Sequence, residues 1–128
     1  MNSFLYTGGC HCQAIRFEIK LENSIEQTEI TSCNCSMCEK TAYLHLIIAK
    51  TKMKLLSNNG NLSNYQFNKK IAKHYFCKTC GIKSFYQPRS HPDKWSINAR
   101  CLDDFSTFKI NTASFDGKNW EQNIHKIT

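Results

Sequence analysis

The chain has 128 residues, 41% of them hydrophobic, and a formal net charge of +7. A chain of this length is expected to form one domain over residues 1–128, because it can bury roughly two thirds of its unfolded surface around one core. The sequence has no apolar run of about 18 residues, which argues against a membrane span. Its first residues do not show the positively charged and then apolar regions of a signal peptide, so a cytoplasmic protein is expected.

Short stretches in which apolar and polar residues alternate predict strands. The clearest is 14–19, in which Ile15, Phe17 and Ile19 share one face. Weaker candidates follow at residues 43–49, 52–56, 71–76, 82–86, 95–98 and 107–111. The pattern predicts a small, mostly β protein built of antiparallel sheets.

Turn-forming residues separate these stretches. The segments 57–61, 88–93 and 116–119 are rich in Asn, Gly, Pro, Asp and Ser, which tolerate tight or left-handed backbone, so they are interpreted as loops. No apolar stripe with a period of 3.6 residues is sustained. Helices are therefore expected to be few and short, with one turn over residues 35–40.

Eight cysteines carry most of the chemistry in this sequence. In a chain without an export signal they are expected to stay reduced, and reduced cysteine clusters are more often metal sites than disulfides. They form three close groups and one single residue: Cys10 and Cys12; Cys33, Cys35 and Cys38; Cys77 and Cys80; and Cys101. Two cysteines one or two residues apart can reach one tetrahedral Zn²⁺ from a single tight turn.

Counting ligands predicts two zinc ions per chain. A structural site takes four protein ligands. The first and third groups supply four: Cys10, Cys12, Cys77 and Cys80. This metal would join the first strand to the middle of the domain, and its removal is expected to loosen or unfold the chain. Gly81, directly after the third group, suits a turn in which amides fold over the sulfurs.

The second group has three cysteines, Cys33, Cys35 and Cys38, and no obvious fourth ligand. Three protein ligands and one open position are how catalytic zinc is held. Such a site, with a net charge of about −1, can accept a further thiol and hold it as a thiolate at neutral pH. Two alternatives stay open: Cys101 closes a second structural site, or only one zinc binds and the other cysteines are small buried apolar residues.

The positive charge does not by itself indicate a nucleic-acid partner. Seven ligating thiolates and two zinc ions would lower the net charge to about +4. The lysines are scattered, with only Lys69 and Lys70 adjacent, and basic residues do not alternate with aromatic ones as in RNA-binding modules. Nucleic acid is therefore an unlikely partner, no membrane is expected, and the sequence sets no oligomeric state.

The motifs, in this order, resemble those of a known family. Residues 8–12 (GGCHC), 33–38 (CNCSMC) and 76–81 (FCKTCG) are similar to the motifs of the glutathione-dependent formaldehyde-activating enzyme and centromere protein V family. Residues 85–93, 98–103 and 115–120 are similar to the centromere protein V branch. The likeness runs from about Thr7 to Thr128. One departure is Gln13, where the family commonly has glycine.

The resemblance implies a β-rich fold of the Mss4-like (β-tent) type with two zinc ions. It places a structural zinc on Cys10, Cys12, Cys77 and Cys80, and a catalytic zinc on Cys33, Cys35 and Cys38. It also implies a carbon–sulfur lyase whose substrate is an adduct such as S-(hydroxymethyl)glutathione. The partners would then be a small thiol such as glutathione and a small aldehyde such as formaldehyde.

For the reaction, our hypothesis is that the thiol binds at the open zinc and adds to the aldehyde carbonyl, and that the reverse reaction breaks the same bond. Glutathione is anionic, so cationic and amide side chains after the last zinc turn are candidate contacts: Arg89, Asn98 and Arg100. His91, in a loop, is a candidate proton carrier. Structural hydrogen bonds are expected for His11, His45 and His74.

A different class of function also fits the sequence. Small β domains held together by zinc are often non-enzymatic modules that bind protein or nucleic acid. In such a module, loss of Cys38 would unfold the chain as badly as loss of Cys80.

Overall fold

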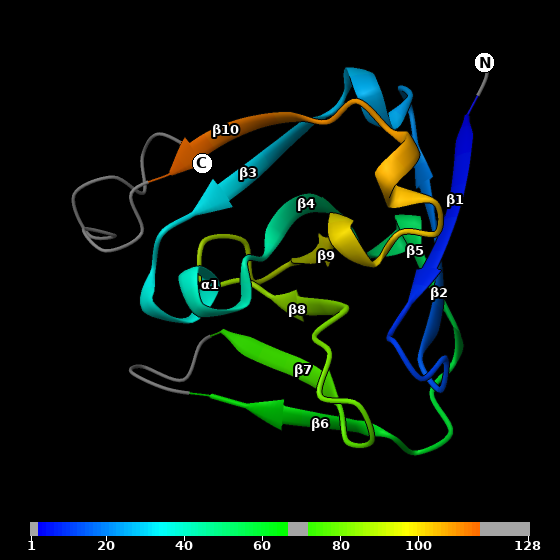
Figure 1. Ribbon diagram of the computed structural model, residues 1–128, viewed down its shortest axis with the longest axis vertical. Coiled ribbons are helices and arrows are strands. Elements are labelled where there is room, and N and C mark those ends of the chain that lie inside the picture. Colours follow the sequence, from blue (N-terminus) through cyan, green and yellow to red (C-terminus); the bar gives the residue numbers. More distant parts are fainter. Residues whose placement is uncertain (1–2, 67–71, 116–128) are drawn as a thin grey trace.

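The computed structural model describes residues 3–66 and 72–115, which form two β-sheets, one short α-helix and four 3-10 turns. The predicted loop at 116–119 lies outside the described residues. Within the described ranges, no helix is both long and apolar enough to cross a membrane. Figure 1 shows the smaller sheet along one side of the molecule, with the strands of the larger sheet arranged beside it from β10 to β6.

The smaller sheet is antiparallel, in the order β1-β2-β5: β1 (Phe4–Gly9), β2 (Arg16–Leu21) and β5 (Met53–Ser57). The larger sheet has the order β10 (Asn111–Phe115), β3 (Glu29–Cys33), β4 (Leu44–Ala49), β9 (Lys94–Asn98), β8 (Phe85–Gln87), β7 (Lys73–Cys77) and β6 (Leu62–Tyr65). The helix α1 (Ser36–Thr41) connects β3 to β4. The 3-10 turns are η1 (Ile25–Gln27), η2 (Lys50–Lys52), η3 (Ala99–Cys101) and η4 (Phe105–Thr107).

One apolar core draws side chains from both sheets. In β2, Phe17 and Ile19 are completely buried, whereas Glu18 between them is half-exposed, as the alternating pattern predicts. Leu46 of β4 and Ile97 of β9 belong to the same core. Full burial of each such side chain contributes about 1.5–3 kcal/mol, so this contact holds the two sheets together.

Strand β4 is buried on both faces, and its two faces differ in chemistry. Leu44, Leu46 and Ile48 enter the apolar core. Successive side chains of a strand point to opposite faces, so Tyr43, directly before the strand, and His45 lie on the other side. There Tyr43 forms a second, smaller cluster with cysteine side chains. The fold therefore has a polar interior behind this strand.

The predicted fold class, a small and mostly β protein, is confirmed, as is the short helix near residues 35–40. The strands expected at 14–19, 43–49, 52–56, 71–76, 82–86 and 95–98 correspond to β2, β4, β5, β7, β8 and β9, with shifted ends. The strands β1, β3 and β6 were not predicted. The sheets are largely antiparallel, but β10 pairs with β3 in parallel.

The strand predicted at 107–111 is wrong. Asp104 has a left-handed backbone (φ 59°) and starts the turn η4, in which the amide and the hydroxyl of Thr107 both donate to the Asp104 carbonyl. Pairing begins only at Asn111, opposite Glu29. The alternation of apolar residues just after Thr107 therefore comes from an extended connection that precedes β10.

Candidate metal centres and their cleft

The first cysteine cluster joins the two sheets. Cys10 and Cys12 lie in the turn between β1 and β2, whereas Cys77 ends β7 and Cys80 lies in the turn that follows. All four sulfur atoms lie within 4.8 Å of one another. The Sγ atom of Cys12 is 3.6 Å from that of Cys10 and 3.5 Å from that of Cys77. Four sulfurs placed tetrahedrally at about 2.3 Å from Zn²⁺ would be about 3.8 Å apart, so this cluster fits zinc.

One backbone amide and one side-chain amide are directed at sulfurs of this cluster. The amide of Ile15 donates to Cys10 Sγ at 3.3 Å, and the Asn61 side chain approaches Cys77 Sγ at 3.8 Å. Gly81 suits its turn through a left-handed backbone (φ 78°) and not through close approach, because an added Cβ would meet no atom within 4 Å. The hydrogen bonds to the sulfurs favour the thiolate form that a metal requires.

Gln13, where the family commonly has glycine, also has a left-handed backbone (φ 71°). An L side chain in this region costs about 1–2 kcal/mol relative to glycine. We therefore expect the free energy of unfolding of Gln13→Gly to exceed that of Gln13→Ala by about 1 kcal/mol, so that Gln13→Gly unfolds at a higher denaturant concentration. Both variants lose the hydrogen bonds of the Gln13 side chain to the Cys10 carbonyl and to Arg16, so the comparison isolates the backbone. Equal stability of the two metal-loaded variants in urea would contradict this reading of the turn.

The second cluster lies entirely at the junction of β3 and α1. Cys33 ends β3, Cys35 is the N-cap of the helix, and Cys38 lies in its first turn. The amide of Cys38 donates to Cys35 Sγ at 3.3 Å, and the amide of Cys35 donates to Cys33 Sγ at 3.4 Å. The three sulfurs lie within 4.8 Å of one another, so this set also fits a tetrahedral metal with one position left for another ligand.

These three thiols share protons as a unit. Hydrogen bonds from the thiols of Cys33 and Cys38 lower the pKa of Cys35 to about 2. The pKa values of Cys33 and Cys38 are raised, mainly by the same hydrogen bonds. One thiolate is thus already favoured at neutral pH in the cluster, and a bound cation would displace the remaining protons.

His45 is the buried neighbour of this cluster. Its Nε2 lies 3.2 Å from Cys38 Sγ, whereas its Nδ1 lies 3.0 Å from the Ser96 hydroxyl and 3.1 Å from the Tyr86 hydroxyl. Burial lowers the pKa of His45 to about 3, so the ring is neutral. When Cys38 is a thiolate, as metal binding requires, its sulfur can only accept, so the proton lies on Nε2 and Nδ1 accepts from the Ser96 or the Tyr86 hydroxyl.

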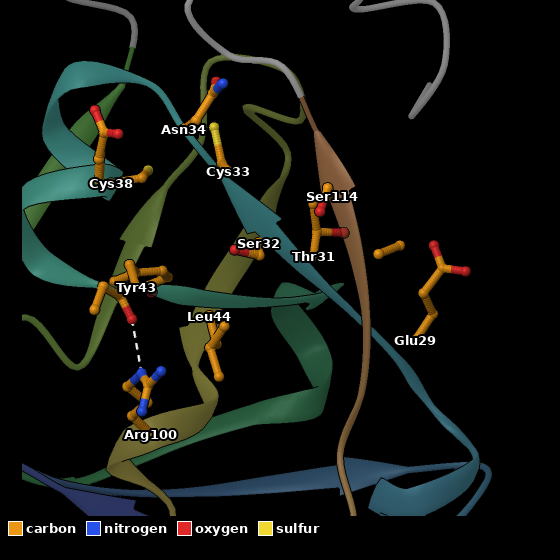
Figure 2. A pocket seen from close by; sticks show the side chains of 13 residues that line it. Glu29, Thr31, Ser32, Cys33, Asn34, Cys38, Tyr43, Leu44, Arg100 and Ser114 are labelled. Atoms are coloured by element: carbon orange, nitrogen blue, oxygen red, sulfur yellow. Dashed lines mark hydrogen bonds between the residues drawn. The ribbon is translucent and has the colours of Figure 1, made fainter.

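A cleft of about 660 Å³ opens beside the second cluster. Figure 2 shows Cys33 and Cys38 on one side of it and Arg100 on the other, with Tyr43 between them. The other lining residues come from β3, α1, the start of β4 and β10: Glu29, Thr31, Ser32, Asn34, Glu39, Ala42, Leu44, Ala113 and Ser114. Cys33, which is partly exposed, and Cys38, which is only 2% exposed, therefore border a polar cleft large enough for a small peptide-like ligand.

The four candidate substrate contacts lie in different environments. Arg100 lines the cleft, and its Nε donates to the Ala42 carbonyl at 2.8 Å. Asn98 is buried, and its side chain bonds to the backbone of Lys83 and Arg100, which holds that segment in place. Arg89 and His91 lie in the loop between β8 and β9 and are not among the described residues that line this cleft.

Cys101 is not part of the second cluster among the residues that the structure describes. Its thiol points to the Lys83 carbonyl at 3.9 Å, and burial raises its pKa to about 11. The charges that act on it come from Cys10 and Cys80 of the first cluster. The geometry therefore does not favour Cys101 as the residue that closes the cysteine triplet.

Comparison with known proteins identifies the family of this chain. Residues 5–118 match the model of the family described as glutathione-dependent formaldehyde-activating enzyme. The chain belongs to that family. It is also similar to a Rhodobacter sphaeroides protein of known crystal structure, with 29% identity and a TM-score of 0.70 over 84% of this chain and 99% of the other.

In this member of the formaldehyde-activating family, sequence reasoning missed the residues behind the cysteine triplet. His45 was expected to make structural hydrogen bonds, and it contacts the Ser96 and Tyr86 hydroxyls, but its contact with Cys38 was not predicted and Lys83 was not singled out. One signal was present for His45, since the strand at 43–49 has one wholly apolar face and a second face that carries Tyr43 and His45. A tyrosine and a histidine on the inner face of a fully buried strand indicate a polar interior.

Proposed function

We propose that this chain forms and breaks the carbon–sulfur bond between a glutathione-like thiol and a small aldehyde, with S-(hydroxymethyl)glutathione as the expected substrate. Membership of the formaldehyde-activating family supports the theme of glutathione and formaldehyde. The observation that carries the proposal is the position of Cys33 and Cys38 on the wall of a polar cleft. A purely structural metal site has no need of such access.

Two zinc ions per chain are part of the proposal, one on each cysteine cluster. The first, on Cys10, Cys12, Cys77 and Cys80, is structural. The second, on Cys33, Cys35 and Cys38, would supply a positive centre that favours the thiolate form of a substrate sulfur.

The chain's own residues would bind and orient the substrate. Arg100, on the cleft wall, can pair with a carboxylate of the thiol. Tyr43, completely buried, closes the floor of the cleft, and the Nε2 proton of His45 stabilises negative charge on Cys38. In the cleavage direction the hydroxyl of the adduct loses its proton to water, a carbon–oxygen double bond forms, and the carbon–sulfur bond breaks with its electron pair leaving on sulfur.

The test is the rate at which a preformed adduct of glutathione and formaldehyde releases free thiol after dilution, followed with a chromogenic thiol reagent. Protein loaded with two equivalents of zinc should accelerate release by at least about tenfold at catalytic concentration, because the site holds the leaving sulfur in a favourable position. The same protein treated with a chelator is the control. If the zinc-loaded protein does not change the rate of thiol release, the result would favour the alternative, a zinc-bearing module that binds protein or nucleic acid.

Two finer expectations accompany this proposal. Placement in the centromere protein V branch rests on the sequence of residues 85–93, 98–103 and 115–120 and stays a prediction. A cytoplasmic location likewise stays a prediction, and it is consistent with a cysteine-rich chain whose thiols must remain reduced to bind metal.

A further inference from the structure

Lys83 is a buried cation close to the second cysteine cluster. It lies between the turn of Cys80 and the start of β8, and it is only 5% exposed. Its Nζ is 2.9 Å from Nδ1 of His74, and it sits over the rings of Tyr43 and Tyr86, 4.5 Å from each centroid. An ammonium group enclosed by two aromatic faces and one acceptor nitrogen is desolvated, and the cation–π contacts offset only part of that cost.

The three rings described in contact with the Lys83 ammonium group, those of His74, Tyr43 and Tyr86, carry no negative charge. Burial and the Lys83 charge lower the pKa of His74 to about 4, so this ring is neutral and accepts a hydrogen bond from the ammonium group. The His74 ring is stacked on Tyr86 at 4.6 Å with an interplanar angle of 11°. Burial raises the pKa values of both tyrosines well above their ordinary range, so they too are neutral. The charge that balances Lys83 must lie beyond these rings.

The cysteine triplet lies directly behind the same two tyrosines. Tyr43 and Tyr86 pack in one cluster with Cys38, and Cys33 and Cys35 border that cluster. The Tyr86 hydroxyl contacts His45, which in turn contacts Cys38. Burial lowers the pKa of Lys83, and the charge of these three cysteines, when ionised, raises it. Among the described residues, Lys83 is not one of those that line the cleft, and the two tyrosines connect it to the triplet.

We infer that Lys83 is the buried counter-charge of the second metal centre and that it strengthens metal binding there. Three thiolates around a divalent cation leave a net charge of about −1, and a substrate thiolate would make it about −2. A cation one aromatic ring away stabilises this negative charge in a medium of low dielectric constant. The inference rests on the two-metal part of the proposed function and is independent of the lyase reaction.

The test is cobalt titration in the presence of a competing chelator, which gives the affinity of each cysteine cluster from its thiolate charge-transfer absorption. The variants are Lys83→Met, which removes both the charge and the hydrogen bond to His74, and Lys83→Gln, which removes the charge but can still donate to His74. Lys50→Met is the matched control, because the Lys50 Nζ also lies over an aromatic ring, 4.6 Å from the Trp95 centroid, but on the exposed surface. Thermal unfolding is recorded for each protein before the second equivalent is added.

Both Lys83 variants should bind cobalt at the second cluster about 10–100-fold more weakly, with the first cluster unchanged, as loss of a supporting group does at other metal sites. Removal of the buried charge is favourable and loss of the partner of His74 is unfavourable, so their melting temperatures should stay near that of the wild type. Weaker metal binding in a protein of unchanged stability cannot come from structural damage. Second-cluster affinity within threefold of wild type in either variant would overturn the inference.

The outcomes for this inference and for the proposed function can be told apart. A loss of affinity in both variants, together with a wild type that does not act on the adduct, upholds the role of Lys83 and rejects the lyase reaction. A wild type that takes up only one equivalent of cobalt rejects the second metal centre and with it the role of Lys83.

Discussion

Replacing Cys80 by serine is expected to destabilise the folded protein more than any other substitution considered. The four cysteines of the first cluster join residues that are far apart in the chain, with Cys12 and Cys77 separated by 65 positions. Metal binding at such a site is part of the folding free energy, and apparent values of about 10–16 kcal/mol are comparable to the whole stability of a domain, about 5–15 kcal/mol. Losing one ligand should cost more than about 4 kcal/mol. This corresponds to a fall of roughly 15 °C in melting temperature.

Circular dichroism of zinc-loaded Cys80→Ser during heating measures this effect. The matched control is Lys78→Ala, in the same turn, because Lys78 is exposed and holds its place through a backbone hydrogen bond to Asn61. The control should melt within about 2 °C of the wild type, since exposed substitutions seldom exceed 0.5 kcal/mol. A Cys80→Ser protein that melts with its control would mean that the first cluster holds no structural metal.

The spacing of the cysteines carried most of the predictable information. Two sulfurs one or two residues apart are constrained by local backbone geometry alone, so grouping Cys33 with Cys35 and Cys38 required no knowledge of the fold. The long-range pairing of Cys10 and Cys12 with Cys77 and Cys80 followed from the number of ligands that zinc takes, and the structure brings these four sulfurs together.

Features set by tertiary contacts were not predictable in this way. Strand β10 forms because Asn111 meets Glu29 in parallel register and its side chain donates to the Glu26 carbonyl, a contact over 85 positions that leaves no local pattern. Lys83 illustrates the same limit. A lysine two residues after a glycine turn is expected on the surface, and only the packing of Tyr43 and Tyr86 around it makes it a buried charge.

The two cysteine clusters therefore differ in what their metals can do for the fold. The first closes a long loop and connects the sheets, whereas the second binds within six consecutive residues, 33–38, that β3 and α1 already position. Loop-closure entropy grows with the number of residues enclosed, so a metal on the second cluster contributes little to folding. A metal on the second cluster is therefore available for a role other than stabilising the fold.

Replacing Cys38 by serine should accordingly leave a folded protein with one metal ion. The loss of stability should stay within about 2 kcal/mol, the range of ordinary core changes, because β4 and the buried tyrosines remain in place. Release of thiol from the glutathione–formaldehyde adduct should fall to the rate of the chelator-treated control, since even supporting groups around a metal typically account for 10–100-fold. Elemental analysis, thermal melts and the rate assay on one preparation give all three quantities.

Cys101→Ser is the matched control, because this thiol is partly buried but lies outside both clusters among the described residues. It should keep two metal ions and the wild-type rate. If Cys38→Ser instead unfolds as extensively as Cys80→Ser, both clusters are structural and the protein is a binding module. If Cys101→Ser loses the second metal, Cys101 is its fourth ligand and no position is open for a substrate thiol. A folded Cys38→Ser with one metal and no activity is the result that only an open, reactive second centre produces.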